Sequence, residues 1–88
     1  MKIEKVRITN PAGLHARAAA KLVEVASEYE SVIKVGQKRM VDSTSILSLM
    51  MLAAVNGTEL RIEAEGPDEK EAINAVRKLI ENGFGEPE

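Results

Sequence analysis

Strand-like and helix-like segments alternate along this chain of 88 residues, and turn-forming glycine, proline or asparagine residues mark most of the boundaries between them. β-Branched residues or alternating apolar and charged residues predict strands at residues 2–8, 32–35, 39–41 and 60–64. Apolar spacing and capping residues predict helices at residues 16–28, at 46–52 and between Asp68 and Asn82. The order βαββαβα predicts an α+β fold, an open-faced β-sandwich in which three helices cover one face of a four-stranded antiparallel sheet.

The first and last predicted helices each carry one apolar face. In the first helix this face is formed by Ala19, Leu22, Ala26 and Tyr29. In the last helix it is formed by Ala72, Ile73, Val76, Leu79 and Ile80. We expect Asp68 to cap the last helix, with Glu71 placed for a partial capping box, and Asn82-Gly83 to end it.

The helix predicted at residues 46–52 is apolar on nearly every side. One short helix cannot bury its whole circumference in so small a domain. We therefore expect some of its side chains to face solvent or a partner. Residues 42–45 (Asp-Ser-Thr-Ser) offer several capping side chains just before it.

Composition and charge exclude several classes of function. We expect residues 1–88 to form a single domain. The formal net charge is -2 and aromatic residues are scarce, so neither a basic face nor a stacking platform for nucleic acid is expected. The absence of cysteine excludes disulfides and thiol catalysis. No apolar run has membrane-spanning length and no signal-peptide pattern is present, so we expect a cytoplasmic protein without membrane contact.

His15 is the single histidine, and it lies between a turn containing Gly13 and the first predicted helix. The first N–H groups of a helix have no intrahelical partner and attract anions, while the same field favours a neutral, nucleophilic ring. Arg17 can add charge-assisted bonds to phosphate oxygens. Chemistry alone favours the simpler interpretation that His15 caps a helix beside an incidental arginine. A metal site is not expected, since no second histidine or cysteine exists.

The run Gly13-Leu14-His15-Ala16-Arg17 resembles the phosphorylation-site motif of the HPr family, the phosphocarriers of the bacterial sugar phosphotransferase system. The resemblance extends over essentially the whole chain. Further matching pieces follow in family order: Asn10-Pro11, Ser45-Ile46-Leu47, Asn56-Gly57-Thr58 and Gly66-Pro67-Asp68-Glu69. The stretch from Ser48 to Phe84 also resembles the nitrogen-related branch of the family.

The resemblance implies a covalent phosphate carrier that is not itself an enzyme and needs no cofactor. His15 would accept a phosphoryl group at Nδ1 from enzyme I and pass it to enzyme IIA domains. Arg17 would neutralise the group during transfer, and the backbone of Ala16 and Arg17 would bind it. A monomer is expected, with both partners docking over Ala16, Ala20, Ile46, Leu47, Met50 and Met51.

Two other interpretations stay open. The first is a regulatory module of the same family, because Ser45 aligns with a serine that a dedicated kinase phosphorylates in some members. A serine kinase/phosphorylase and a transcription regulator would then be partners, although capping the second helix explains Ser45 equally well. The second is an unrelated small domain that binds a metabolite or itself, with a structural His15.

The chain departs from the family pattern at two places. Ala18 stands where the family normally has proline, and the hairpin between residues 32 and 41 is one residue short. Proline would stiffen the first helical turn, whereas Ala18 keeps helix propensity, so we expect the site to survive with less preorganisation.

Overall fold

The computed structural model describes residues 1–86, and its elements follow the predicted order. The strands are β1 (Lys2–Arg7), β2 (Val32–Gly36), β3 (Met40–Asp42) and β4 (Glu59–Glu65). The helices are α1 (Ala16–Ala26), α2 (Ile46–Met51), α3 (Glu69–Glu81) and the short 3₁₀ helix η1 (Gly83–Gly85). Observed bounds differ from the expected ones by at most two residues, and the first helix ends at Ala26, where the chain turns toward β2.

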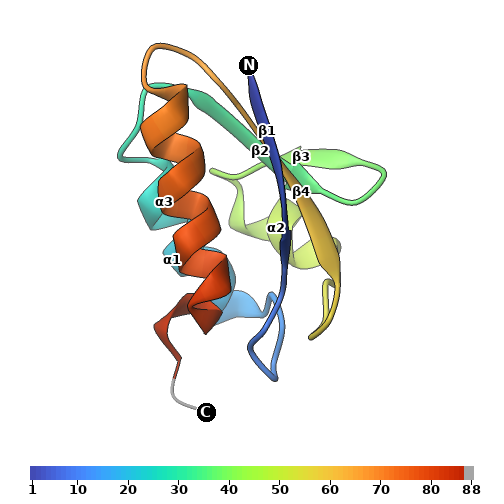
Figure 1. Ribbon diagram of the computed structural model, residues 1–88. Coiled ribbons are helices and arrows are strands. Elements are labelled where there is room, and N and C mark those ends of the chain that lie inside the picture. Colours follow the sequence, from blue (N-terminus) through green and yellow to red (C-terminus); the bar gives the residue numbers. More distant parts are fainter. Residues whose placement is uncertain (87–88) are drawn as a thin grey trace.

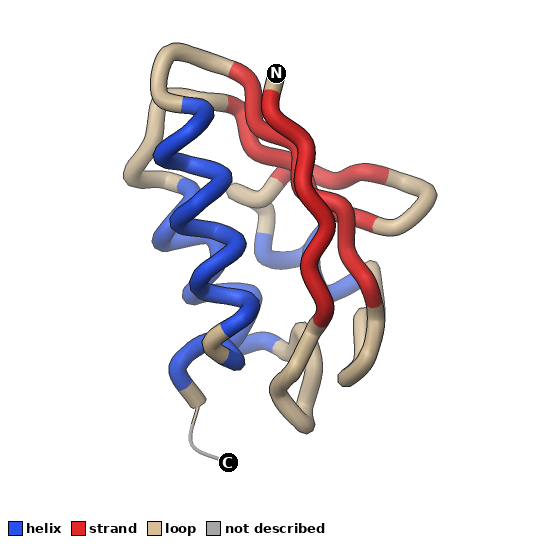
Figure 2. The backbone as a smooth tube through the Cα atoms, in the orientation of Figure 1, coloured by secondary structure: helices blue, strands red, loops and turns tan. Residues whose placement is uncertain are grey.

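The four strands form one antiparallel sheet in the order β1-β4-β2-β3. The helices α1 and α3 run along one face of this sheet, as Figures 1 and 2 show. The short helix α2 packs against α1 and β3. The predicted α+β open-faced sandwich with βαββαβα order is confirmed.

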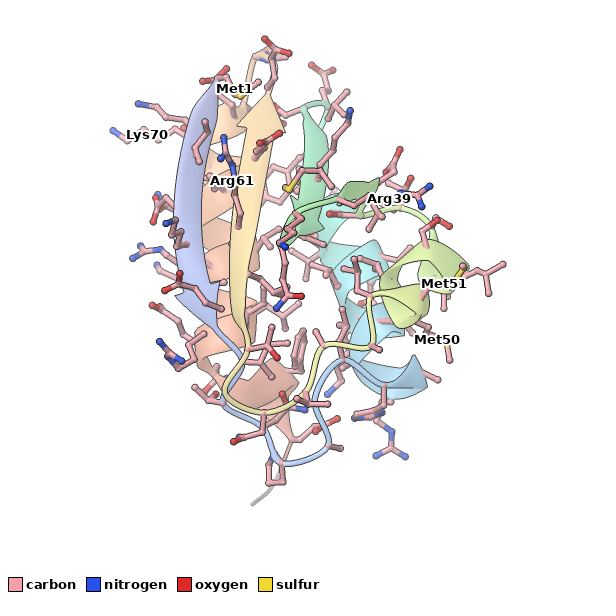
Figure 3. The ribbon with its side chains drawn as sticks, turned by 90° about the vertical axis from the view of Figure 1, so that its right-hand side faces the viewer. Met1, Arg39, Met50, Met51, Arg61 and Lys70 are labelled. Atoms are coloured by element: carbon pink, nitrogen blue, oxygen red, sulfur yellow. The ribbon has the colours of Figure 1, made fainter. Side chains whose placement is uncertain are left out.

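Strand β4 lies in the middle of the sheet, paired with β1 on one side and β2 on the other. Its Leu60, Ile62 and Ala64 are fully buried, whereas the alternating charged residues lie on the opposite face. Figure 3 shows Arg61 on this uncovered face. The alternation of apolar and charged residues in the sequence therefore corresponds to a strand with one buried face and one solvent-exposed face.

The helices bury the apolar faces that the sequence predicts. In α1 the fully or nearly fully buried residues are Ala18, Ala19, Leu22 and Ala26, and in α3 they are Ala72, Ile73, Val76 and Ile80. Tyr29 and Leu79 are only partly buried and pack against the edge of this core. Phe84, in η1, is fully buried and anchors the chain beyond α3 to the core.

Asp68 precedes α3 as predicted, but its side chain does not cap that helix. Its carboxylate instead accepts hydrogen bonds from the backbone N–H groups of Glu30 (3.0 Å) and Ser31 (2.9 Å) and from the Ser31 hydroxyl. The predicted capping box with Glu71 is wrong, because the oxygens of Asp68 already bind the loop that contains Glu30 and Ser31. Glu69 Oε1 accepts from the Gly66 N–H at 3.2 Å. The hydrogen bonds to its own carboxylate lower the pKa of Asp68, and the Ser31 hydroxyl contributes most, before the Glu30 N–H.

Candidate functional site

The loop before His15 is anchored to the loop that precedes β4. The Leu14 N–H donates to the Ala54 carbonyl at 2.8 Å, and Asn10 Nδ2 donates to the Gly13 carbonyl at 2.8 Å. Gly13 has a φ of +69°, and a Cβ at this position would lie 2.4 Å from the Ala54 carbonyl oxygen. A side chain would therefore push the two loops apart and displace the start of α1.

His15 is the N-cap residue of α1, in an extended conformation. Its Nδ1 accepts the backbone N–H of Arg17 at 3.2 Å, and its carbonyl accepts the N–H of Ala19 at 2.8 Å. One third of the side chain is exposed, at 33%. The ring thus lies at the positive end of a helix of 11 residues and within reach of a partner.

The second ring nitrogen of His15 is occupied. Nε2 contacts the carboxylate of Glu86, whose other oxygen accepts from Asn10 Nδ2 at 2.9 Å. The Asn10 amide, followed by His15, lowers the pKa of Glu86 and keeps this carboxyl ionised near neutral pH. Sequence reasoning missed Glu86, because a glutamate 71 positions from the histidine gives no local signal.

Arg17 is exposed on the first turn of α1 and makes no ion pair within residues 1–86. Its side chain can therefore reach toward an anion held at Nδ1 without first breaking a contact in the described part of the chain. Ala18 is fully buried, yet α1 still begins at Ala16. The replacement of proline thus leaves the start of the helix in place.

Helix α2 presents apolar side chains to solvent beside α1, as the sequence predicts. Four of them are exposed: Ile46 (42%), Leu47 (70%), Met50 (42%) and Met51 (75%). Leu49 is fully buried, and Leu52 is partly buried. Figure 3 shows Met50 and Met51 pointing away from the body of the protein. Ala16 and Ala20, on α1, are also exposed, and we call this group of six exposed residues the α1–α2 surface.

Ser45 is the N-cap of α2 and is partly exposed. Its Oγ accepts the Ser48 N–H at 3.2 Å and lies 3.0 Å from the Ser48 hydroxyl. The exposed Val55 lies next to Gly13 and extends the apolar surface toward His15, a neighbour that the sequence did not indicate.

Within residues 1–86, no group of three or more acidic or histidine side chains is arranged to hold a metal ion. No helix in this part of the chain is long and apolar enough to span a bilayer. The site therefore contains one imidazole with a carboxylate at its Nε2, one exposed guanidinium and the N–H groups of a helix start.

Comparisons with known proteins agree with this geometry. The family model described as "PTS HPr component phosphorylation site" matches residues 3–82. A phosphocarrier protein HPr of Cupriavidus necator is 49% identical over 82 residues, which is 92% of each chain. The crystal structure of an HPr from Thermoanaerobacter tengcongensis superposes with a TM-score of 0.94 at 43% identity and covers all of both chains. A structure described as an HPr dimer from that organism has a TM-score of 0.76 at 44% identity, covering 98% of this chain and 100% of the other. The chain therefore belongs to the HPr family of phosphocarrier proteins.

Proposed function

We propose that His15 accepts a phosphoryl group from enzyme I and passes it to enzyme IIA domains of a phosphotransferase system. The chain is then a covalent intermediate rather than an enzyme, working as a single-domain monomer in the cytoplasm. The observation that carries this proposal is the position of His15 at the start of α1, partly exposed, with Nδ1 facing the Arg17 N–H.

The chemistry follows from that position. The Nδ1 lone pair attacks phosphorus while the bond from phosphorus to the donor breaks with its electron pair, and the Arg17 N–H that Nδ1 releases donates to a phosphoryl oxygen instead. Losing the N-cap costs about 0.5–2 kcal/mol. A hydrogen bond to a charged oxygen contributes about 1.5–3 kcal/mol, so the exchange is favourable or neutral. The Arg17 guanidinium adds charge-assisted bonds when the group arrives and leaves.

The α1–α2 surface is the proposed docking site for both partners. Its apolar side chains adjoin the exposed start of α1, so a protein that covers them also reaches His15. Burial of exposed apolar area supplies binding free energy, and the same surface serves donor and acceptor in turn.

The test is incubation with phosphoenolpyruvate and enzyme I, read by intact mass. We expect one acid-labile phosphate, which is absent from His15→Ala. An unmodified folded protein, in a reaction where enzyme I phosphorylates a known HPr, would refute the proposal.

The role of Arg17 is tested by the rate of the same reaction. We expect Arg17→Ala to slow transfer while the fold is kept. Lys70→Ala is the matched control, because it removes one exposed positive charge from the start of α3, away from α2 in Figure 3. Equal rates for the two variants would remove the role assigned to Arg17.

A regulatory role through Ser45 is the second proposal, favoured by the position of its hydroxyl at the N-cap of α2 next to the α1–α2 surface. A phosphate there would add charge to an apolar docking site and weaken binding. An acid-stable phosphate on Ser45, formed with ATP and host extract, would support this role. A fully active extract that leaves Ser45 unmodified would contradict it.

A further inference from the structure

The segment after α3 folds back across the start of α1. Phe84 is fully buried, and its carbonyl accepts from Lys21 Nζ at 2.7 Å. Two residues later, the Glu86 carboxylate lies between His15 Nε2 and Asn10 Nδ2. The side chain of Glu86 is only 14% exposed, so this contact is enclosed by the fold.

The orientation of the Asn10 amide fixes the carboxylate. Asn10 is 3% exposed, and its Nδ2 donates both to the Gly13 carbonyl and to Glu86. Its Oδ1 has no partner within residues 1–86. Flipping the amide would place Oδ1 against two acceptors, so the donor side must face Glu86.

The two contacts of the His15 ring select the same tautomer. A neutral imidazole has one N–H and one lone pair. An ionised carboxylate can only accept, so Nε2 carries the proton that faces Glu86. The Arg17 N–H is a donor, so Nδ1 carries the lone pair.

We propose that Glu86 is a positioning residue that holds the proton on Nε2 of His15, so that Nδ1 is the nitrogen that takes the phosphoryl group. This inference rests on the proposed function. In the transfer step, the Nδ1 lone pair forms the N–P bond while the bond from phosphorus to the donor breaks with its electron pair. The Nε2 proton stays in place, and the ring gains a positive charge that faces the Glu86 carboxylate.

The experiment uses phosphoramidate, a small phosphoryl donor that needs no protein partner, on chain labelled with ¹⁵N-histidine. ³¹P and ¹⁵N NMR identify the modified ring nitrogen, and ¹⁵N shifts of the free protein report the tautomer. We expect wild type to react at Nδ1 and Glu86→Ala to give a mixture with Nε2. The ratio of the Nε2–H to the Nδ1–H form should fall about tenfold on loss of one charge-assisted bond.

Two further variants sharpen the test. Glu86→Gln has a single acceptor oxygen for two donors; with that oxygen held by Asn10 Nδ2, its NH2 group faces Nε2 and cannot accept the Nε2–H, so this variant should also lose Nδ1 selectivity. Glu24→Ala removes an exposed carboxylate from α1 and should behave as wild type. Unchanged selectivity and tautomer ratio in a folded Glu86→Ala would overturn the inference and leave the carrier function standing. Absence of any His15 adduct with enzyme I and phosphoenolpyruvate would refute the carrier function, while the tautomer ratio would still decide the role of Glu86.

Discussion

The same substitution at two leucines of α2 should affect two different properties, partner binding at one and stability at the other. Leu47 is 70% exposed on the α1–α2 surface, whereas Leu49, two residues on, is fully buried. Replacing either with alanine keeps helix propensity, so the helix itself is not the variable. We predict that Leu47→Ala weakens partner binding and that Leu49→Ala weakens the fold.

The magnitudes follow from burial. Complete burial of a leucine contributes about 1.5–3 kcal/mol. Because most of Leu47 is still exposed and alanine keeps one methyl group, docking should lose about 1 kcal/mol, equivalent to about a fivefold higher Kd. The free energy of unfolding of the Leu47→Ala variant should change by less than about 0.5 kcal/mol. Leu49→Ala should cost about 2–5 kcal/mol and lower Tm by at least about 8 °C.

The assay pairs isothermal titration of each variant against enzyme I and an enzyme IIA domain with thermal unfolding by circular dichroism. Binding is compared at a temperature where both variants are folded. If Leu47→Ala binds both partners as wild type does, the α1–α2 surface is not the docking site. If it melts as early as Leu49→Ala, the division between core and surface on α2 is wrong.

Two further predictions concern the stability of the fold. Phe84→Ala should destabilise the protein by about 3–5 kcal/mol, measured by urea unfolding, because it empties a fully buried aromatic position; a loss below about 1 kcal/mol would contradict the anchoring role of Phe84. Asp68→Asn should destabilise the protein most at neutral pH. The folded-state pKa of Asp68 is lowered, first by the Ser31 hydroxyl, so its stabilising effect is present above the ordinary pKa and lost as the pH falls through the folded value. Unfolding at several pH values checks this, and a difference from wild type that grows below about pH 4 would refute it.

The fold could be predicted because its signals are local. Strand β4 alternates in period two, and α1 and α3 repeat every three or four residues, so each element carries its own signature. The details that failed depend on distant residues. Asp68 lies in a sequence typical of an N-cap, but its carboxylate binds a loop 37 residues away instead of the helix. No local sequence pattern indicates that hydrogen bond.

In the candidate site too, the features that depend on neighbouring residues could be predicted and the one that depends on distant residues could not. The place of His15 at a helix start and the exposure of Leu47 follow from neighbouring residues, so the sequence indicated both. The contact of Glu86 with His15 depends on how the burial of Phe84 places residues 84–86 beside the start of α1. Physical reasoning on sequence alone gives no distance between two such segments, and a glutamate near the end of a chain is otherwise an ordinary solvated residue.

The central place of β4 also determines when the protein can form during synthesis. Strand β1 is made first, yet its partner begins at Glu59, and β2 pairs with the same late strand. The chain up to Glu65 must therefore exist before the sheet closes, and such pairings between distant parts of the sequence make folding slower than in a helical bundle of similar size. The loop that carries His15 cannot be fixed earlier either. Its hydrogen-bond acceptors are the carbonyls of Ala54 and Thr58, which are translated just before β4. A nascent chain interrupted earlier has the histidine but no framework to hold it.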